Sequence, residues 1–127
     1  MKSLLLSQVY IKTNGIYIPS QSIPTVNRYV FTYTITIYNL GKKILQLISR
    51  YWSITNGNGK KIQIYGEGVI NKNPYIAPGN NFHHTNGAIL ETPIGILEGH
   101  YIIIDENNHV YHVEIPIFRL AIKTYIH

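Results

Sequence analysis

One stretch, NRYVFTYTITIYNLG from residue 27, alternates strictly between large apolar residues and threonines. Successive side chains of a β-strand point to opposite sides, so this alternation predicts a long strand with a single core face. That core face would carry Tyr29, Phe31, Tyr33, Ile35 and Ile37, with Thr32, Thr34 and Thr36 opposite. No window of the chain shows a convincing helical repeat. The fold must therefore be assembled from strands.

A second strand is predicted over Ile44 to Thr55, and a third over KKIQIYGEG, with the turn NGNG between them. Asn and Gly tolerate the positive φ angles of tight turns, so NGNG predicts a hairpin that makes the two strands antiparallel neighbours. Uniform alternation along the second strand would place Ile48, Arg50, Trp52 and Ile54 on one face and Leu45, Leu47, Ser49 and Tyr51 on the other.

The remaining segments are also short and strand-like. Strands are predicted around Val9 to Thr13, in NFHHTNGAILE, and in HYIIID and HVYHVEIP, which flank ENN as a hairpin. Residues 69–80, which contain Pro74 and APGN, are expected to form a surface loop that ends in a turn. TPIGILEG is interrupted by a proline and two glycines. This pattern predicts an antiparallel sandwich or barrel.

Two details favour an immunoglobulin-like β-sandwich. Trp52 falls on the strand where such sandwiches often bury a tryptophan. In GHYIIID, Tyr101 stands two residues before apolar Ile103, as in a tyrosine corner, although an ordinary strand tyrosine fits the same letters.

The composition narrows the class of protein. A chain of 127 residues has room for one domain, and the lack of cysteine excludes disulfides, thiolate metal sites and a thiol nucleophile. The amino-terminal segment, MKSLLLSQVY, has only three consecutive leucines, which is too few for the apolar region of a signal peptide. No later apolar run reaches membrane-spanning length. A cytoplasmic protein without membrane contact is expected. The charge of +5 comes from scattered basic residues, so nucleic acid is not expected as a partner.

Several blocks resemble the bacterial ApaG family in order and spacing: NRYVFTYTITIYNLG, LISRYWSIT, GEGVINKNPYIAPGNNF, GAILETPIGILEGHY and VEIPIFRL. The resemblance covers about residues 8–120, so the chain, 1–127, would be a single ApaG domain with short tails. It implies a fibronectin type III-like or immunoglobulin-like sandwich. It also implies association with cobalt and magnesium efflux and with diadenosine tetraphosphate hydrolysis in bacteria, and with protein contacts in eukaryotic proteins. It names no reaction for the domain itself.

The glycine-rich stretch formed by Gly66, Glu67, Gly68 and Asn71 raises a pyrophosphate-binding hypothesis. A dinucleotide fingerprint needs a third glycine and the amino end of a helix. Asn71 stands where ApaG relatives often carry that glycine, and Pro74 leaves no room for a helix. Glycines that mark a strand bend are the favoured interpretation. Binding, or secondarily hydrolysis, of a pyrophosphate-containing nucleotide is the alternative function.

Histidines and acids give no further site. His83 and His84 are adjacent in a strand and should point to opposite faces. In either turn register of the ENN hairpin, His109 shares a face with His100 but lies far along the ladder from it, while His112 faces the other way, so no metal site is predicted. Most acids fall at turns or strand ends, and no nucleophile elbow or phosphate loop occurs. Neither a catalytic residue nor a cofactor is predicted.

A binding surface is the remaining prediction, with Arg50, Tyr51 and Trp52 as its candidates, because arginine and aromatic residues are enriched at interface hot spots. In one arrangement Arg50 lies beside a partly exposed Trp52 and meets a peptide or an acidic partner. In the other, Trp52 is in the core and Arg50 pairs with Glu67. An open edge strand offers a second route, to a peptide or to a homodimer. The sequence thus predicts a non-catalytic module that binds a protein or a small ligand.

Overall fold

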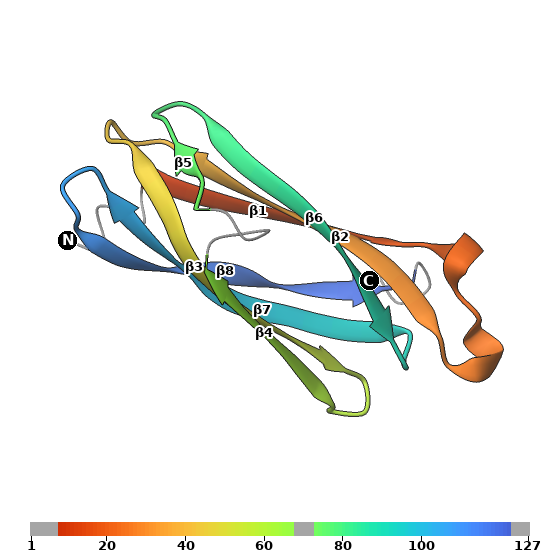
Figure 1. The fold of residues 1–127 in the computed structure, drawn as a ribbon. Coiled ribbons are helices and arrows are strands. Elements are labelled where there is room, and N and C mark those ends of the chain that lie inside the picture. Colours follow the sequence, from red (N-terminus) through yellow and green to blue (C-terminus); the bar gives the residue numbers. More distant parts are fainter. Residues whose placement is uncertain (1–7, 68–72, 123–127) are drawn as a thin grey trace.

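The computed structural model describes residues 8–67 and 73–122, of which 63–67 are described by their backbone alone (Figure 1). Within these described residues, two short 3-10 helices and eight strands follow one another. In order they are β1 (Val9–Tyr17), η1 (Pro19–Gln21), η2 (Pro24–Val26), β2 (Tyr29–Asn39), β3 (Leu45–Asn56), β4 (Lys61–Glu67), β5 (Tyr75–Ile76), β6 (Asn81–Leu90), β7 (Ile94–Asp105) and β8 (Val110–Ala121). None of the described helices is long and apolar enough to cross a membrane.

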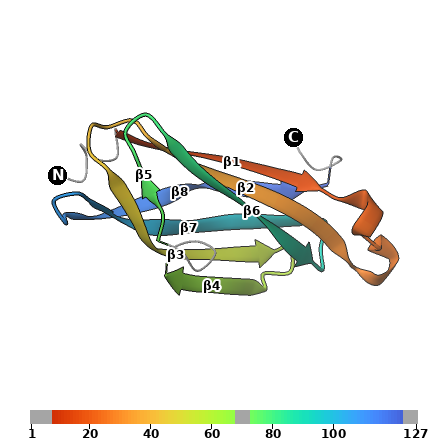
Figure 2. The same ribbon diagram turned by 45° about the horizontal axis from the view of Figure 1, so that its top comes forward.

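The strands form two stacked antiparallel sheets (Figure 2). One has the order β1-β2-β6, and the other has the order β4-β3-β7-β8 with the short β5 paired to β3. This confirms the predicted immunoglobulin-like sandwich, in which β3 takes the place of strand C and β7 that of strand F.

The alternation in β2 is confirmed. Phe31, Ile35 and Ile37 are fully buried and Tyr33 nearly so, whereas the intervening threonines are half-buried. On the outer face, the hydroxyls of Thr34 and Thr85 lie 2.8 Å apart across β2 and β6. The pattern was reliable because this strand keeps one register along its whole length.

The prediction of uniform alternation along β3 is wrong. A β-bulge interrupts the ladder, since Leu47 pairs with Ile103 while Ser49 pairs with Ile102. One extra residue on one strand exchanges the two faces beyond it. The apolar residues on both sides of the bulge therefore share one core: Leu45, Leu47, Trp52 and Ile54.

The interruption expected in TPIGILEG is also wrong, because β7 continues through Gly95 and Gly99. A side chain at Gly99 would overlap the backbone of β3: its Cβ would lie 2.6 Å from Trp52 Cα and even nearer to the carbonyl oxygen of Tyr51. Glycine here permits close strand contact rather than ending the strand.

The predicted turns are present. Asn56 N donates to Lys60 O across the β3-β4 turn, where Gly59 has a φ of +82°. Asn80 N donates to Ala77 O, which closes the expected turn at Pro78-Gly79. Tyr75 and Ile76, in the segment expected to be a loop, instead form the short strand β5, which pairs with β3.

Candidate functional site

Four aromatic rings meet between the two sheets, one from each of β2, β3, β6 and β7. The His84 imidazole stacks on the Trp52 indole with centroids 5.2 Å apart and 12° between the ring planes. Tyr33 and Tyr101 meet the indole edge-on, with centroids at 6.2 and 6.0 Å. Both arrangements are favourable for aromatic pairs. All four side chains are buried, so the cluster joins the two sheets rather than offering a surface.

His84 is held in its neutral form. Asn86 Nδ2 donates to His84 Nδ1 at 3.3 Å, so the proton of the neutral ring lies on Nε2 and is donated to Tyr101 Oη at 2.9 Å. Burial, and then the positive charges of Arg50 and His83, lower the pKa of His84 to about 4. Burial also raises the pKa of Tyr101. Neither group titrates near neutral pH, so the pair is unsuited to general acid-base catalysis.

The three residues predicted to form a binding surface do not lie together on one. Trp52 is 0% exposed and belongs to the core, so a surface that includes it is excluded. Arg50 turns towards the indole, with its guanidinium carbon 5.0 Å from the ring centroid, and its Nε is buried without a hydrogen-bond partner in the described part of the chain. Tyr51 is on the opposite face, where its ring lies 5.4 Å from that of His100. The alternative ion pair with Glu67 involves a side chain outside the described residues.

The tyrosine-corner interpretation of Tyr101 is wrong. The residue lies within β7, and its hydroxyl reaches His84 on the facing sheet. In a tyrosine corner the hydroxyl would bond the backbone a few residues upstream. The alternative, an ordinary strand tyrosine, is the one observed.

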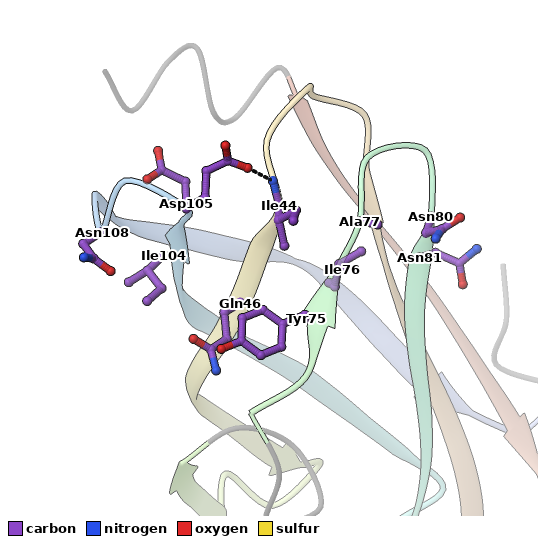
Figure 3. Close-up of a pocket in the computed structure, with 11 residues that line it drawn as sticks. Ile44, Gln46, Tyr75, Ile76, Ala77, Asn80, Asn81, Ile104, Asp105 and Asn108 are labelled. Carbon is purple, nitrogen blue, oxygen red and sulfur yellow. Dashed lines mark hydrogen bonds between the residues drawn. The ribbon is translucent and has the colours of Figure 1, made fainter.

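A pocket of about 710 Å³ lies at one end of the sandwich, beside β5 (Figure 3). Its wall combines buried Ile76 with Tyr75 and Ile44, which are 71% and 44% exposed. Side-chain amides complete the lining, from Gln46, Asn80, Asn81 and Asn108. Small-ligand sites typically measure ~300–1,000 Å³ and combine apolar walls with a few polar groups. The pocket has the size and the chemistry of a binding site.

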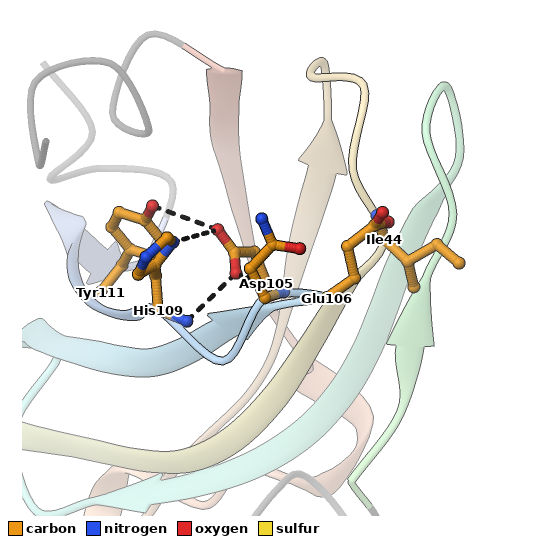
Figure 4. A network of polar contacts seen from close by, with 6 residues as sticks. Ile44, Asp105, Glu106, His109 and Tyr111 are labelled. Atoms are coloured by element: carbon orange, nitrogen blue, oxygen red, sulfur yellow. Dashed lines mark hydrogen bonds and ion pairs between the residues drawn. The ribbon is translucent and has the colours of Figure 1, made fainter.

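The carboxylate of Asp105, at the rim of the pocket, is engaged in the β7-β8 turn (Figure 4). Its Oδ1 accepts hydrogen bonds from the backbone N–H groups of Asn107 at 2.8 Å and His109 at 3.1 Å. Its Oδ2 lies 3.3 Å from His109 Nδ1 and accepts from the Tyr111 hydroxyl at 3.2 Å. Burial alone would raise the pKa of Asp105, but these hydrogen bonds outweigh it and lower the pKa below its ordinary value of 3.8.

Glu106, the second carboxylate of the rim, is engaged as well. Its Oε1 accepts a hydrogen bond from Ile44 N at 2.8 Å, which ties the β7-β8 turn to the start of β3. Both acids of the pocket therefore accept hydrogen bonds that stabilise the β7-β8 turn and its contact with the start of β3.

We expect Asp105→Asn to lower the urea midpoint at pH 7 and to reduce its dependence on acid. A carboxyl with a lowered folded-state pKa stabilises the fold above pH 3.8, and this contribution is lost as the pH falls through the lowered pKa. Urea unfolding followed by circular dichroism between pH 2.5 and 7 measures both effects. A variant that kept the acid dependence of the unchanged chain would contradict this role for the carboxylate.

The β7-β8 hairpin also corrects the expected positions of its histidines. Asp105 N donates to His109 O, which leaves residues 106–108 in the loop, and Asn108 adopts a φ of +63°. His109 thus pairs with Asp105, on the core-facing side of β7. A loop with one residue more or fewer would have reversed every assignment along β8.

His100 and His112 consequently share the outer face of the second sheet, contrary to the prediction. His100 pairs with Glu114 and Ile102 with His112, and the two imidazole centroids are 4.0 Å apart. The prediction for the other pair is confirmed, since His84 is buried on the core face and its neighbour His83 is exposed.

Only part of the glycine-rich stretch lies within the described residues. Gly66 and Glu67 are the last residues of β4, and Gly66 pairs with Arg50 of β3. Gly68 and Asn71, the other members of the hypothetical pyrophosphate loop, lie outside the described residues.

Sequence reasoning missed the pocket because its lining comes from β3, β5, β6 and the β7-β8 turn, which only the fold brings together. One local signal was available. An aspartate at the start of a turn favours a hydrogen bond from the backbone N–H two residues on, and Asp105 indeed accepts from Asn107 N.

Comparison with known proteins gives consistent results. The ApaG domain family matches residues 19–105. Protein ApaG of Escherichia coli strain K12 is 52% identical over 120 residues, which is 94% of this chain and 96% of that protein, and Protein ApaG of Enterobacter sp. strain 638 is 49% identical over the same shares. The crystal structure of the putative ApaA protein from Bordetella pertussis superimposes with a TM-score of 0.88 at 39% identity, over 91% of this chain and 94% of that one. The chain therefore belongs to the ApaG family.

Proposed function

We propose that the protein is a non-catalytic cytoplasmic binding module, and that its end-of-sandwich pocket holds a short segment of a protein partner. The observation that carries the proposal is the pocket itself, in which apolar side chains are accessible while both carboxylates are engaged in turns. Such a site can hold a ligand, and the known hydrogen bonds of its two carboxylates serve the fold.

The lining suits a peptide. Tyr75 and Ile44 expose apolar surface at the site, and tyrosine is a frequent anchor at protein interfaces. The Asn81 amide offers a donor and an acceptor, and Gln46, whose Nε2 donates to Asn73 O at 3.2 Å, adds its carbonyl oxygen as an acceptor. These groups match the N–H and C=O groups of an extended backbone. An apolar side chain flanked by free backbone amides is therefore the ligand chemistry that fits.

Titration of the labelled protein with short uncharged peptides that carry one aliphatic or aromatic anchor tests the proposal. We expect saturable NMR shifts of the methyl groups of Ile44, Ile76 and Ile104, and we expect Tyr75→Ser to abolish them. Tyr10→Ser is the matched control, because Tyr10 is also exposed, at 54%, but lies on β1 of the other sheet.

A parallel titration with diadenosine tetraphosphate distinguishes the proposed peptide binding from the alternative function, which is nucleotide binding. Saturable shifts confined to residues 66–71 would favour the pyrophosphate hypothesis, and chromatographic detection of hydrolysis products would contradict a non-catalytic module. A peptide panel that left the pocket methyl groups unshifted would contradict the proposed site.

A further inference from the structure

Two histidines and a glutamate gather on the outer face of the second sheet, away from the core. They are His100 on β7 and His112 and Glu114 on β8. One possible ligand atom from each lies within 4.8 Å of those of the other two, and His112 Nε2 is 3.5 Å from Glu114 Oε2. The cross-strand pairing of His100 with Glu114 fixes the grouping, since side chains at positions 112 and 114 of one strand share a face.

We propose that His100, His112 and Glu114 form a binding site for a divalent transition-metal ion such as Zn²⁺ or Ni²⁺. With metal-ligand bonds of ~2.0–2.1 Å, neighbouring ligand atoms of a tetrahedral site lie about 3.3–3.4 Å apart. The spacing of His112 and Glu114 already approaches this value, and small side-chain rotations would bring His100 to it. Two imidazoles with one carboxylate favour borderline metal ions over Mg²⁺, which prefers oxygen ligands and retains several waters.

The surroundings of the site support metal binding. The side chains of His112 and Glu114 are 40% and 73% exposed, which leaves the ion a path from solvent. The Tyr51 ring packs beside the His100 imidazole, with the two ring centroids 5.4 Å apart.

Three protein ligands leave at least one coordination position free. In zinc sites with three protein ligands, this position is taken by water or substrate. Two of the three ligands lie on β8, an edge strand of the sheet, and are exposed, so this position would be open to solvent. It would accept water or a donor side chain from a partner.

Calorimetric titration of the full chain, expressed without a polyhistidine tag, with Zn²⁺ at pH 7 tests the proposal. We expect saturable binding of one ion per chain, about 10–100-fold or more weaker in His112→Ala and in Glu114→Ala, because even changes around the ligands cost this much in known sites. His83→Ala is the matched control, an exposed histidine on β6 whose loss should leave the affinity unchanged. The imidazole resonances of His100 and His112 should shift together.

Circular dichroism verifies that the variants fold, which is expected for exposed positions. Undiminished Zn²⁺ affinity in the His112→Ala/Glu114→Ala double variant would overturn the proposal. The absence of saturation below millimolar Zn²⁺, or shifts confined to His83, His109 or His127, would overturn it equally.

Discussion

Gly99→Ala should destabilise the domain by roughly 3 kcal/mol or more, at or above the upper end of the usual ~1–3 kcal/mol cost of overpacking. The new methyl group would meet backbone atoms of β3, the Tyr51 carbonyl oxygen and Trp52 Cα, rather than a side chain that could rotate away. Relief would require the β3-β7 ladder to separate beside the buried Trp52. Urea unfolding followed by circular dichroism, or failure to recover folded protein, measures the effect.

Gly87→Ala provides the control for this experiment. Gly87 also lies within a strand, β6, but the nearest atom to an added Cβ is Phe31 O at 3.9 Å, an ordinary contact distance. We expect this variant to change stability little. Equal stability of the Gly87→Ala and Gly99→Ala proteins would show that the close strand contact does not constrain the fold.

Acidification from pH 7 to pH 4 should weaken the fold through His84. Its folded-state pKa is about 4, below the ordinary value of 6.5, so the unfolded chain takes up the proton first as the pH falls. The stabilisation is complete above pH 6.5 and is lost progressively down to about pH 4. One pKa unit corresponds to ~1.4 kcal/mol, so the loss is roughly 3 kcal/mol at most.

His84→Gln isolates this contribution. The amide does not titrate, so the variant should be less stable at pH 7 but should lose less of its stability between pH 7 and 4.5. Urea midpoints at several pH values compare the two slopes. An unchanged slope would assign the acid sensitivity to another group, such as His100, whose pKa is also lowered from 6.5.

The sequence was most informative where one strand kept one register. The alternation of β2 predicted its buried face correctly, and NGNG predicted the β3-β4 hairpin, because both signals depend on residues adjacent in the chain. The family blocks then agreed with the strand order. Fold class was therefore accessible without coordinates.

Two of the errors concern the face of a strand on which residues lie. The bulge before Ser49 exchanges the two faces of β3 for every residue beyond it, and the three-residue loop at 106–108, although predicted as ENN, places His112 rather than His109 on the face of His100. Gly99 was misinterpreted because a glycine that ends a strand and one that admits a neighbouring backbone look alike in sequence. The site residues, set by distant contacts, could not be grouped by local patterns.

The bulge in β3 affects how relatives of this protein should be aligned. An alignment that assumed uniform alternation of polar and apolar residues along β3 would be wrong by one position beyond Ile48. Solvent-facing residues of one protein would then be matched to inward-facing residues of another. The crossing of Gly99 with Trp52 offers a fixed reference for numbering, because its geometry admits no such slip. Alignments anchored at this pair would match inward-facing positions with inward-facing positions and solvent-facing positions with solvent-facing positions.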